Sequence, residues 1–256
     1  MATTLRFDNL NVLDSKVINV KGSSKSKMPK PIPYREYFGI MYITPDNMKN
    51  RIRLAEEIED VMLYVFAYWL ITAEDELSED ELRRDAKDKL TSVIAKHSKL
   101  DEYLEQHINK VVDEVIDTTE KHTGRKKTQE AQGDVLQDET LALLETSTDT
   151  EEDDEDAEKE YWTSRDRAML IAENEANAFY NYEDYREAKL EGKTQKTWIT
   201  ELDDKVRLTH TLVEGKTVDI DGLFFVGDSL MRFPKDTYYD PSPKETVNCR
   251  CSVLYK

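Results

Sequence analysis

The chain has 256 residues, a formal net charge of −18 and a hydrophobic content of 38%. That content is low for one compact globule of this length, so a two-part protein is favoured. The charge excludes strong nonspecific DNA binding by the chain as a whole.

The charge is unevenly placed along the chain. Residues 1–51 carry nine Lys and Arg against four Asp and Glu, and residues 161–256 carry fourteen against seventeen, so most of the acid lies between them. A basic arm joined to an acidic middle favours an assembly component. A nucleic-acid enzyme would more often be basic over most of its surface.

Signals for secretion and for membrane insertion are missing from the sequence. Residues 1–10 contain no apolar core of a signal peptide, and the longest apolar run, residues 61–71, is too short to span a bilayer. Two cysteines cannot form a disulfide framework. We therefore expect a soluble protein, made in a cytosol, with no membrane partner.

Residues 1–43 are expected to form a basic arm. Residues 10–13 and 17–20 are short β-like stretches, residues 22–29 have linker composition, and residues 37–43 are a candidate strand. The lysines of the arm lack interleaved aromatic residues, so a solvated arm is favoured over a phosphate-binding one. They are Lys16, Lys21, Lys25, Lys27 and Lys30.

A module of three or four helices is expected over residues 44–124. Thr44 and Pro45 suit the start of a first helix, whose 62–71 portion is apolar almost all round and should be buried in a bundle or against a partner. Ser78 and Glu81 form a capping box for the next helix, and a further helix should end near residue 124. The histidines of this module are expected to be solvated: His97, His107 and His122.

Residues 125–160 are expected to be an acidic linker between two independently folded parts. Asp and Glu supply nine of the twelve residues at 149–160, and like charges at that density cannot bury a core. One or two helical turns around residues 135–144 are the exception.

Residues 161–256 are expected to form a small α+β domain, which makes the whole chain α+β. Helical periodicity over residues 161–190 ends at Gly192. The first two expected strands would pair as a hairpin around Asp221 and Gly222. The expected strands are residues 217–220, 223–226 and 253–255.

The same region carries distinctive residues in a characteristic order. The order is Arg167 and Glu175, Trp198, Asp203 and Asp204, Arg207 and His210, Pro234 and Asp236, and Asn248-Cys249-Arg250-Cys251. Over residues 161–256 this order resembles the bacteriophage Mu F-like minor head proteins, also called phage head morphogenesis proteins. The chain departs from the family pattern in having Asn174 before Glu175, where the family has Thr, and in a displaced glycine near Gly227.

The resemblance implies a structural minor head protein of a tailed bacteriophage and no enzymatic activity. It implies a role in procapsid assembly at the portal vertex and in handling the DNA end. The implied partners are the portal protein, scaffolding or major capsid protein, and DNA. The implied location is the virion, in the head interior or at the portal vertex. Residues 1–160 lie outside the resemblance and look like a variable helical portion.

His210, Cys249 and Cys251 are candidate zinc ligands, because imidazole and thiolate suit tetrahedral zinc. The fourth ligand would come from an acidic residue: Asp203, Asp204 or Asp236. The single residue between the cysteines strains chelation. A buried structural corner, in which His210 bonds a backbone group, is therefore favoured over zinc, and a redox pair is the third reading.

Arg207 is expected to form an ion pair with Asp203 or Asp204 that orients its loop. The enzymatic alternative is a metal-dependent nuclease or toxin-like hydrolase with His210 as general base, but no second acidic cluster at metal-binding spacing accompanies it. A zinc-stabilised DNA-binding module is the remaining alternative. Trp198 is expected to anchor the core.

Overall fold

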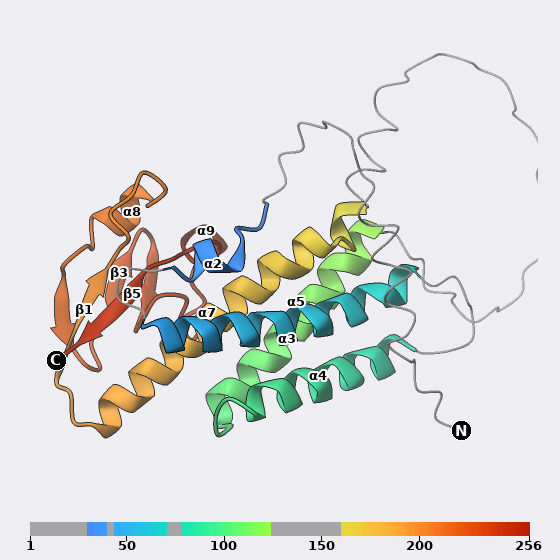
Figure 1. Ribbon diagram of the computed structural model, residues 1–256, viewed down its shortest axis with the longest axis horizontal. Coiled ribbons are helices and arrows are strands. Elements are labelled where there is room, and N and C mark those ends of the chain that lie inside the picture. The colour runs from blue at the N-terminus through green and yellow to red at the C-terminus, as the bar shows by residue number, and fades with distance from the viewer. Residues whose placement is uncertain (1–29, 40–43, 71–77, 124–159) are drawn as a thin grey trace, which may run out of the picture.

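The computed structural model describes residues 30–39, 44–70, 78–123 and 160–256, and its fold is α+β. Long helices pack against one another, and the strands gather at one end of them together with short helices (Figure 1). The long helices are α3 (Pro45–Leu70), α4 (Glu79–Ala95), α5 (Glu102–Thr123) and α7 (Arg165–Leu190). Among the described helices, none combines the length and the apolar character that a bilayer crossing requires.

The helix starts follow the capping chemistry expected from the sequence. At the start of α3, the Thr44 hydroxyl accepts the backbone amide of Asn47 at 3.3 Å. Ser78 and Glu81 make the reciprocal bonds of a capping box before α4. After α7, Gly192 has a φ of +75°, the left-handed conformation that glycine adopts readily beyond a helix end. The predicted helices are confirmed.

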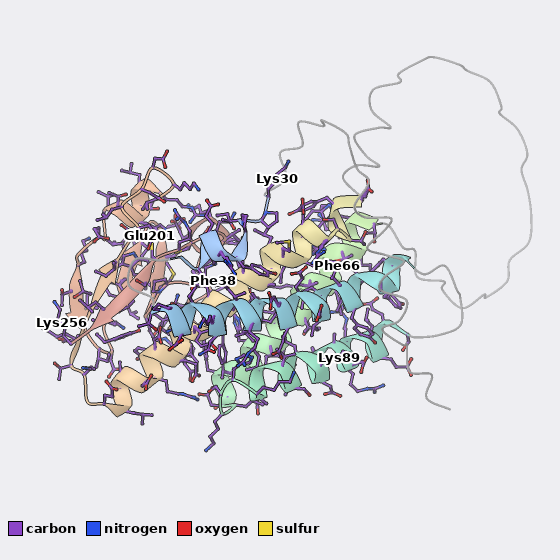
Figure 2. The ribbon with its side chains drawn as sticks, in the orientation of Figure 1. Lys30, Phe38, Phe66, Lys89, Glu201 and Lys256 are labelled. Atoms are coloured by element: carbon purple, nitrogen blue, oxygen red, sulfur yellow. The ribbon has the colours of Figure 1, made fainter. Side chains whose placement is uncertain are left out.

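The central pair of helices is α3 and α7. Phe66 of α3 is fully buried and lies among the bundle helices (Figure 2). Its neighbours in the same core include Met62 of α3 together with Ala172 and Phe179 of α7. Within the apolar stretch of α3, Met62, Val65 and Phe66 are therefore covered by the chain itself, whereas residues 67–69 are half-buried.

One core includes residues from both sides of the 124–159 segment. Buried residues of α3, α4, α5 and α7 form a single cluster that also contains Phe233 of the C-terminal region. At the margin of the segment, the rings of His122 and Trp162 stack with centroids 3.9 Å apart. The parts that we expected to fold independently thus share a core. The boundaries at 125 and 160 stay a prediction, and the helical turns expected at 135–144 lie outside the described residues.

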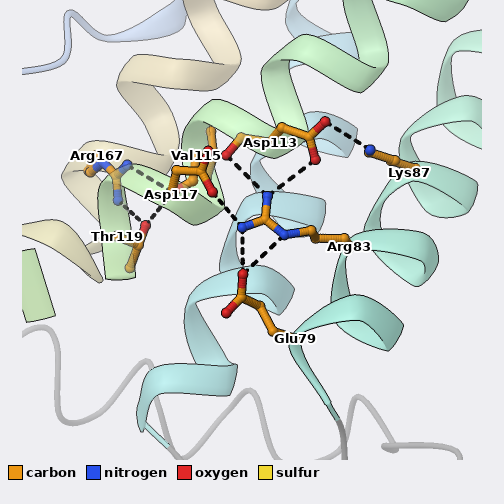
Figure 3. Close-up of polar contacts among 8 residues, drawn as sticks. All are labelled: Glu79, Arg83, Lys87, Asp113, Val115, Asp117, Thr119 and Arg167. Carbon is orange, nitrogen blue, oxygen red and sulfur yellow. Dashed lines mark hydrogen bonds and ion pairs between the residues drawn. The ribbon is translucent and has the colours of Figure 1, made fainter. Parts of the chain in front are cut away.

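Buried or half-buried arginines connect neighbouring helices. Arg83 of α4 donates to Asp113 at 3.2 Å and to Asp117 at 2.5 Å, both on α5 (Figure 3). Arg167 of α7 donates to the hydroxyl of Thr119 on α5 at 2.6 Å (Figure 3). Charge-assisted hydrogen bonds of this kind fix how α5 sits between its neighbours.

The strands form two small antiparallel sheets, one with the order β2-β1-β5 and one with β3 beside β4. In the first sheet Trp198 of β1 lies opposite Val253 of β5, so residues 252–255 form an edge strand of this sheet. Trp198 is fully buried in a second, smaller core, which confirms it as a core anchor. The strands are β1 (Gln195–Ile199), β2 (Thr217–Asp219), β3 (Phe224–Val226), β4 (Ser229–Met231) and β5 (Ser252–Tyr255).

The hairpin predicted around Asp221 and Gly222 is wrong. The strands exist, but β2 pairs with β1, and β3 pairs with β4 across the two-residue turn Gly227-Asp228. Gly227 has a φ of +61°, as the tight hairpin turns require.

The candidate strand at residues 37–43 is also wrong where it can be compared. Tyr37 ends a short helix, α2 (Tyr34–Tyr37), because Pro33 starts a turn whose carbonyl accepts the amides of Glu36 and Tyr37. Residues 40–43 and the β-like stretches at 10–13 and 17–20 lie outside the described residues.

Candidate functional site

His210, Cys249 and Cys251 come together at the strand end of the molecule. His210 lies on the short helix α8 (Leu208–Thr211), and the cysteines lie between α9 (Pro243–Thr246) and β5. Their ligand atoms are all within 4.8 Å of one another, and all three residues are buried. The His210 Nδ1 is 3.3 Å from the Cys251 sulfur and 3.6 Å from the Cys249 sulfur. The predicted convergence is confirmed.

The backbone around the cysteines is fixed by contacts with the helices. Asn248 has a φ of +56°, and its amide donates to the side chain of Asn174 on α7 at 2.9 Å. The carbonyl of Cys249 accepts from the Tyr37 hydroxyl at 3.0 Å and from the Asn177 amide at 3.2 Å. The chain then enters β5, and the two sulfurs, separated by one residue, both face His210, as the period of two in extended chain allows.

The second ring nitrogen of His210 contacts a carboxylate. Its Nε2 lies 3.1 Å from Oε2 of Glu245 on α9, and the Thr209 hydroxyl donates to the same oxygen at 2.7 Å. Glu245 is only 3% exposed. The expected backbone partner of His210 is therefore wrong. Because the carboxylate accepts the Nε2 proton, the Nδ1 lone pair is left facing the sulfurs.

The thiols are electrostatically unequal. The hydrogen bond from Cys251 and the adjacent His210 hold the pKa of the Cys249 thiol well below its usual range, although burial opposes this. The same hydrogen bond and burial raise the pKa of Cys251. Burial works against the charged imidazole, but the hydrogen bond with Cys249 raises the pKa of His210 on balance. A thiol with a lowered pKa beside an imidazole is suited to metal binding or nucleophilic chemistry.

The ion pair expected for Arg207 is wrong. Arg207 donates to the backbone carbonyl of Val247. Asp203 instead pairs with Arg250, whose Nη2 is 2.6 Å and 2.8 Å from the two carboxylate oxygens. Both arginines thus hold the segment that leads to the cysteines.

The acidic residues proposed as a fourth ligand lie outside the cluster. Among the described residues, the group with metal-binding geometry contains His210 and the two cysteines alone. Asp236 is fully buried and forms a two-point ion pair with Arg232, with distances of 2.7 Å and 2.8 Å. The neighbouring Pro234 carbonyl accepts from Asn181 of α7 at 3.0 Å. Pro234 and Asp236 therefore attach this loop to the helices.

A pocket borders the three clustered side chains. Glu201 is one of its lining residues and lies at the strand end of the molecule (Figure 2). The other residues lining the pocket beside the cluster are Lys205, Val206, Arg207, Asn248 and Arg250. Any ligand entering here would meet both polar groups and the buried sulfurs.

The match to a known family extends over more of the chain than the C-terminal motif does. The family model described as Phage Mu protein F like protein matches residues 105–254. The chain belongs to the phage Mu F-like family. Family members act in phage head morphogenesis. The match begins inside α5, so the limit that we set at residue 161 is too far along the chain. No curated protein and no solved structure matches.

The departure of this Mu F-like chain at Asn174 has a structural role. The Asn174 side-chain oxygen accepts from the backbone amide of Asn248 and from the ammonium of Lys235. Lys235 is 3% exposed, and burial lowers its pKa to about 8. An amide at this position therefore joins α7 to the cysteine segment and to the loop of Pro234.

The histidines of the helical module are not simply solvated, as we expected. His107 Nε2 lies 2.6 Å from Glu175 of α7, and its Nδ1 lies 3.0 Å from the Thr237 hydroxyl. The His97 ring is almost fully buried, and His122 stacks on Trp162. Sequence spacing gave no sign of these partners, because each comes from a distant segment.

We did not predict the buried polar residues of α7 from the sequence, although their spacing was informative. Glu173, Asn177 and Asn181 recur every fourth residue, which places them on one helix face, and all three are buried. Arg51 of α3 meets this face and is 1% exposed. Polar residues at helical spacing beside apolar ones can thus indicate a buried polar row. Glu245, in contrast, has no such signal.

Proposed function

We propose that this chain is a structural minor head protein of a tailed bacteriophage that acts in procapsid assembly at the portal vertex. The observation that carries the proposal is the family match over residues 105–254, which includes part of α5, all of α7 and nearly all of the strand region. The virion is the location that fits this family. The partners we propose are the portal protein first, then scaffolding or major capsid protein, and the end of the packaged DNA.

Exposed apolar pairs on the family-matched region support a role in binding proteins. Phe225 and Leu230 are cross-strand partners on β3 and β4 and are 63% and 41% exposed. Leu208 and Leu212 are four residues apart, at and just after α8, and are also exposed. Apolar side chains held in pairs on a surface are typical of contact sites for other proteins.

The test is co-purification with the portal protein of the same phage. The full chain should be retained by the tagged portal, and it should be present in purified heads by mass spectrometry. Exchange of Phe225 and Leu230 for Ser should reduce retention while the circular dichroism spectrum stays unchanged. Leu190→Ser is the matched control, because Leu190 is an exposed leucine at the end of α7 and belongs to neither pair. A chain absent from heads and not retained by the portal would contradict the proposal.

We also propose that the chain has no catalytic turnover. The nuclease alternative needs His210, Arg207 and Asp203 to act together, but Asp203 is engaged by Arg250 and Arg207 by a backbone carbonyl. Incubation of the full chain with DNA and Mg²⁺, Mn²⁺ or Zn²⁺ should leave the DNA intact. Cleavage that disappears in His210→Ala would favour the enzyme.

A further inference from the structure

We propose that His210, Cys249 and Cys251 bind one zinc ion through the His210 Nδ1 and the two sulfurs, with Glu245 positioning the imidazole. The proposal goes beyond head assembly and does not depend on it. The donor set is soft, and thiolate with imidazole is the set that zinc commonly takes in proteins.

The two nitrogen–sulfur distances match those of a zinc site. With Zn–S of about 2.3 Å and Zn–N of about 2.0–2.1 Å, a tetrahedral ion places nitrogen and sulfur about 3.5 Å apart. The two observed separations from His210 Nδ1 are 3.3 Å to Cys251 and 3.6 Å to Cys249. An ion would therefore enter with little movement of the side chains.

One imidazole lone pair of this cluster faces two buried sulfurs, which also hydrogen-bond each other. Because the Nε2 proton of His210 faces Glu245 at 3.1 Å, the Nδ1 atom offers one lone pair. Two buried sulfurs face that lone pair, and it can accept a proton from one of them at a time. A cation bound between the three atoms would satisfy the lone pair and both sulfurs together.

Glu245 completes the arrangement that orients metal-binding histidines. Such histidines almost always donate their other ring N–H to a carboxylate, a backbone carbonyl or water. Glu245 is itself held by the Thr209 hydroxyl at 2.7 Å. Gly227 adjoins it closely, because a Cβ at that position would overlap the Glu245 carboxylate. The ring orientation is thus fixed before any ion binds.

The fourth coordination position would face the pocket. That pocket is lined by all three ligand residues and by Glu201, Arg207 and Asn248, among others. Since no carboxylate of the described residues joins the cluster, water from the pocket would complete a tetrahedral set. The ion would join α8 to the segment before β5, so its main effect would be on stability.

The first experiment measures metal in the full chain. The protein is produced with a tag that contains no histidine, purified without chelators under reducing conditions, and analysed by mass spectrometry for bound metals. About one zinc per chain is expected, and its removal by a chelator should lower the melting temperature, because the metal binds the folded state. Metal content near zero, both as purified and after the reduced chain is incubated with Zn²⁺, would overturn the proposal.

The second experiment uses Co²⁺ as a probe of the ligands. Reduced, metal-free full chain titrated with Co²⁺ should develop sulfur-to-cobalt charge-transfer bands with saturation at about one equivalent. This readout needs no variant and so cannot fail through misfolding. A reduced chain that binds no Co²⁺ would overturn the proposal. So would a Cys249–Cys251 disulfide that forms again after reduction even when Zn²⁺ is present.

Variants then assign the residues. Cys249→Ser, Cys251→Ser and His210→Ala should each lose the bound zinc. Glu245→Gln should keep one equivalent but bind it about 10–100-fold more weakly. His107→Ala is the matched control, since His107 also pairs with a glutamate but has no thiol among its described partners, and it should keep its zinc. Equal zinc content in all of these variants would show that the metal lies elsewhere.

Discussion

Arg51 of α3 donates from Nη1 to the side-chain oxygen of Asn177 on α7 at 2.5 Å. The amide nitrogen of Asn177 donates in turn to the carbonyl of Cys249 at 3.2 Å. A buried guanidinium from the helical module is thus two hydrogen bonds away from the cysteine segment. The helices position the candidate site directly, although the residues involved are far apart in the sequence.

Arg51→Met should lower the free energy of unfolding by about 3–5 kcal/mol, because it leaves the hydrogen-bond partners of a buried guanidinium without their cation. These partners include the buried Asn177 and the partly exposed Asp184, which lies 2.9 Å from Arg51. Urea denaturation followed by circular dichroism measures the change. Lys49→Met on the same helix is the control, since Lys49 is exposed, and it should change stability by less than about 0.5 kcal/mol. Similar losses in both variants would contradict the assigned role.

Phe66→Ala should cost about 3–5 kcal/mol, because it opens a cavity in the core between α3 and α7. Arg167 also lies over the Phe66 ring at 4.9 Å and would lose that contact. Trp69→Ala, at a partly buried position, should cost less. Thermal unfolding of both variants measures the difference. A negligible loss for Phe66→Ala would contradict the place of this ring in the core.

The pair of His107 and Glu175 should make stability depend on pH. Burial lowers the pKa of His107, but Glu175 outweighs it and raises the pKa above its usual value, with smaller effects from Lys110 and Glu114. Since the folded pKa is the higher one, the stabilisation is fully present below about pH 6.5 and is lost as pH rises through the folded pKa. Unfolding free energies across this range should show the decline in the native chain and a weaker decline in Glu175→Gln. The same slope in both would rule this pair out as its source.

Gly227→Ala should destabilise the chain more than Gly192→Ala. Both glycines have positive φ, so both substitutions carry a backbone cost of roughly 1–2 kcal/mol. At Gly192 a Cβ would meet nothing within 4 Å, whereas at Gly227 it would overlap the Glu245 carboxylate. The difference between the variants therefore reports mainly the displacement of Glu245, with a smaller contribution from Thr209, which a Cβ would approach to 3.3 Å. Equal melting temperatures would show that Glu245 moves aside freely.

Limited proteolysis should cut within residues 124–159, where acidic residues dominate. The two fragments should stay together on size-exclusion chromatography, because α3 and α5 share a core with α7. Mass spectrometry of the eluted peak identifies both pieces. Fragments that elute separately would show that each side folds by itself.

Local sequence signals predicted the helices well. The Thr44 and Ser78 caps and the apolar stripes describe interactions within a few residues, and the structure confirms them. The order of residues from Arg207 to Cys251 identified the family. The prediction that His210 and the cysteines lie close together was also correct.

Pairings between distant segments could not be predicted from one sequence. Asp221-Gly222 is a better hairpin dipeptide than Gly227-Asp228 by composition alone, but β1 offers β2 a partner that no local rule reveals. For the same reason the sequence did not reveal that Asp203 pairs with Arg250 and not with Arg207. That contact depends on the pairing of β5 with β1. Glu245 stayed unrecognised because its partner is thirty-five residues away.

The stacked rings of His122 and Trp162 mark the two points where the chain leaves and rejoins the helices. Whatever sequence connects them begins and ends at one place, so its length can change with only a small entropic cost of closure. The length and the charge of this connecting segment can therefore change during evolution without disturbing the helices. The same junction suits insertion of a fluorescent or affinity module, because α5 and α7 would keep their contact.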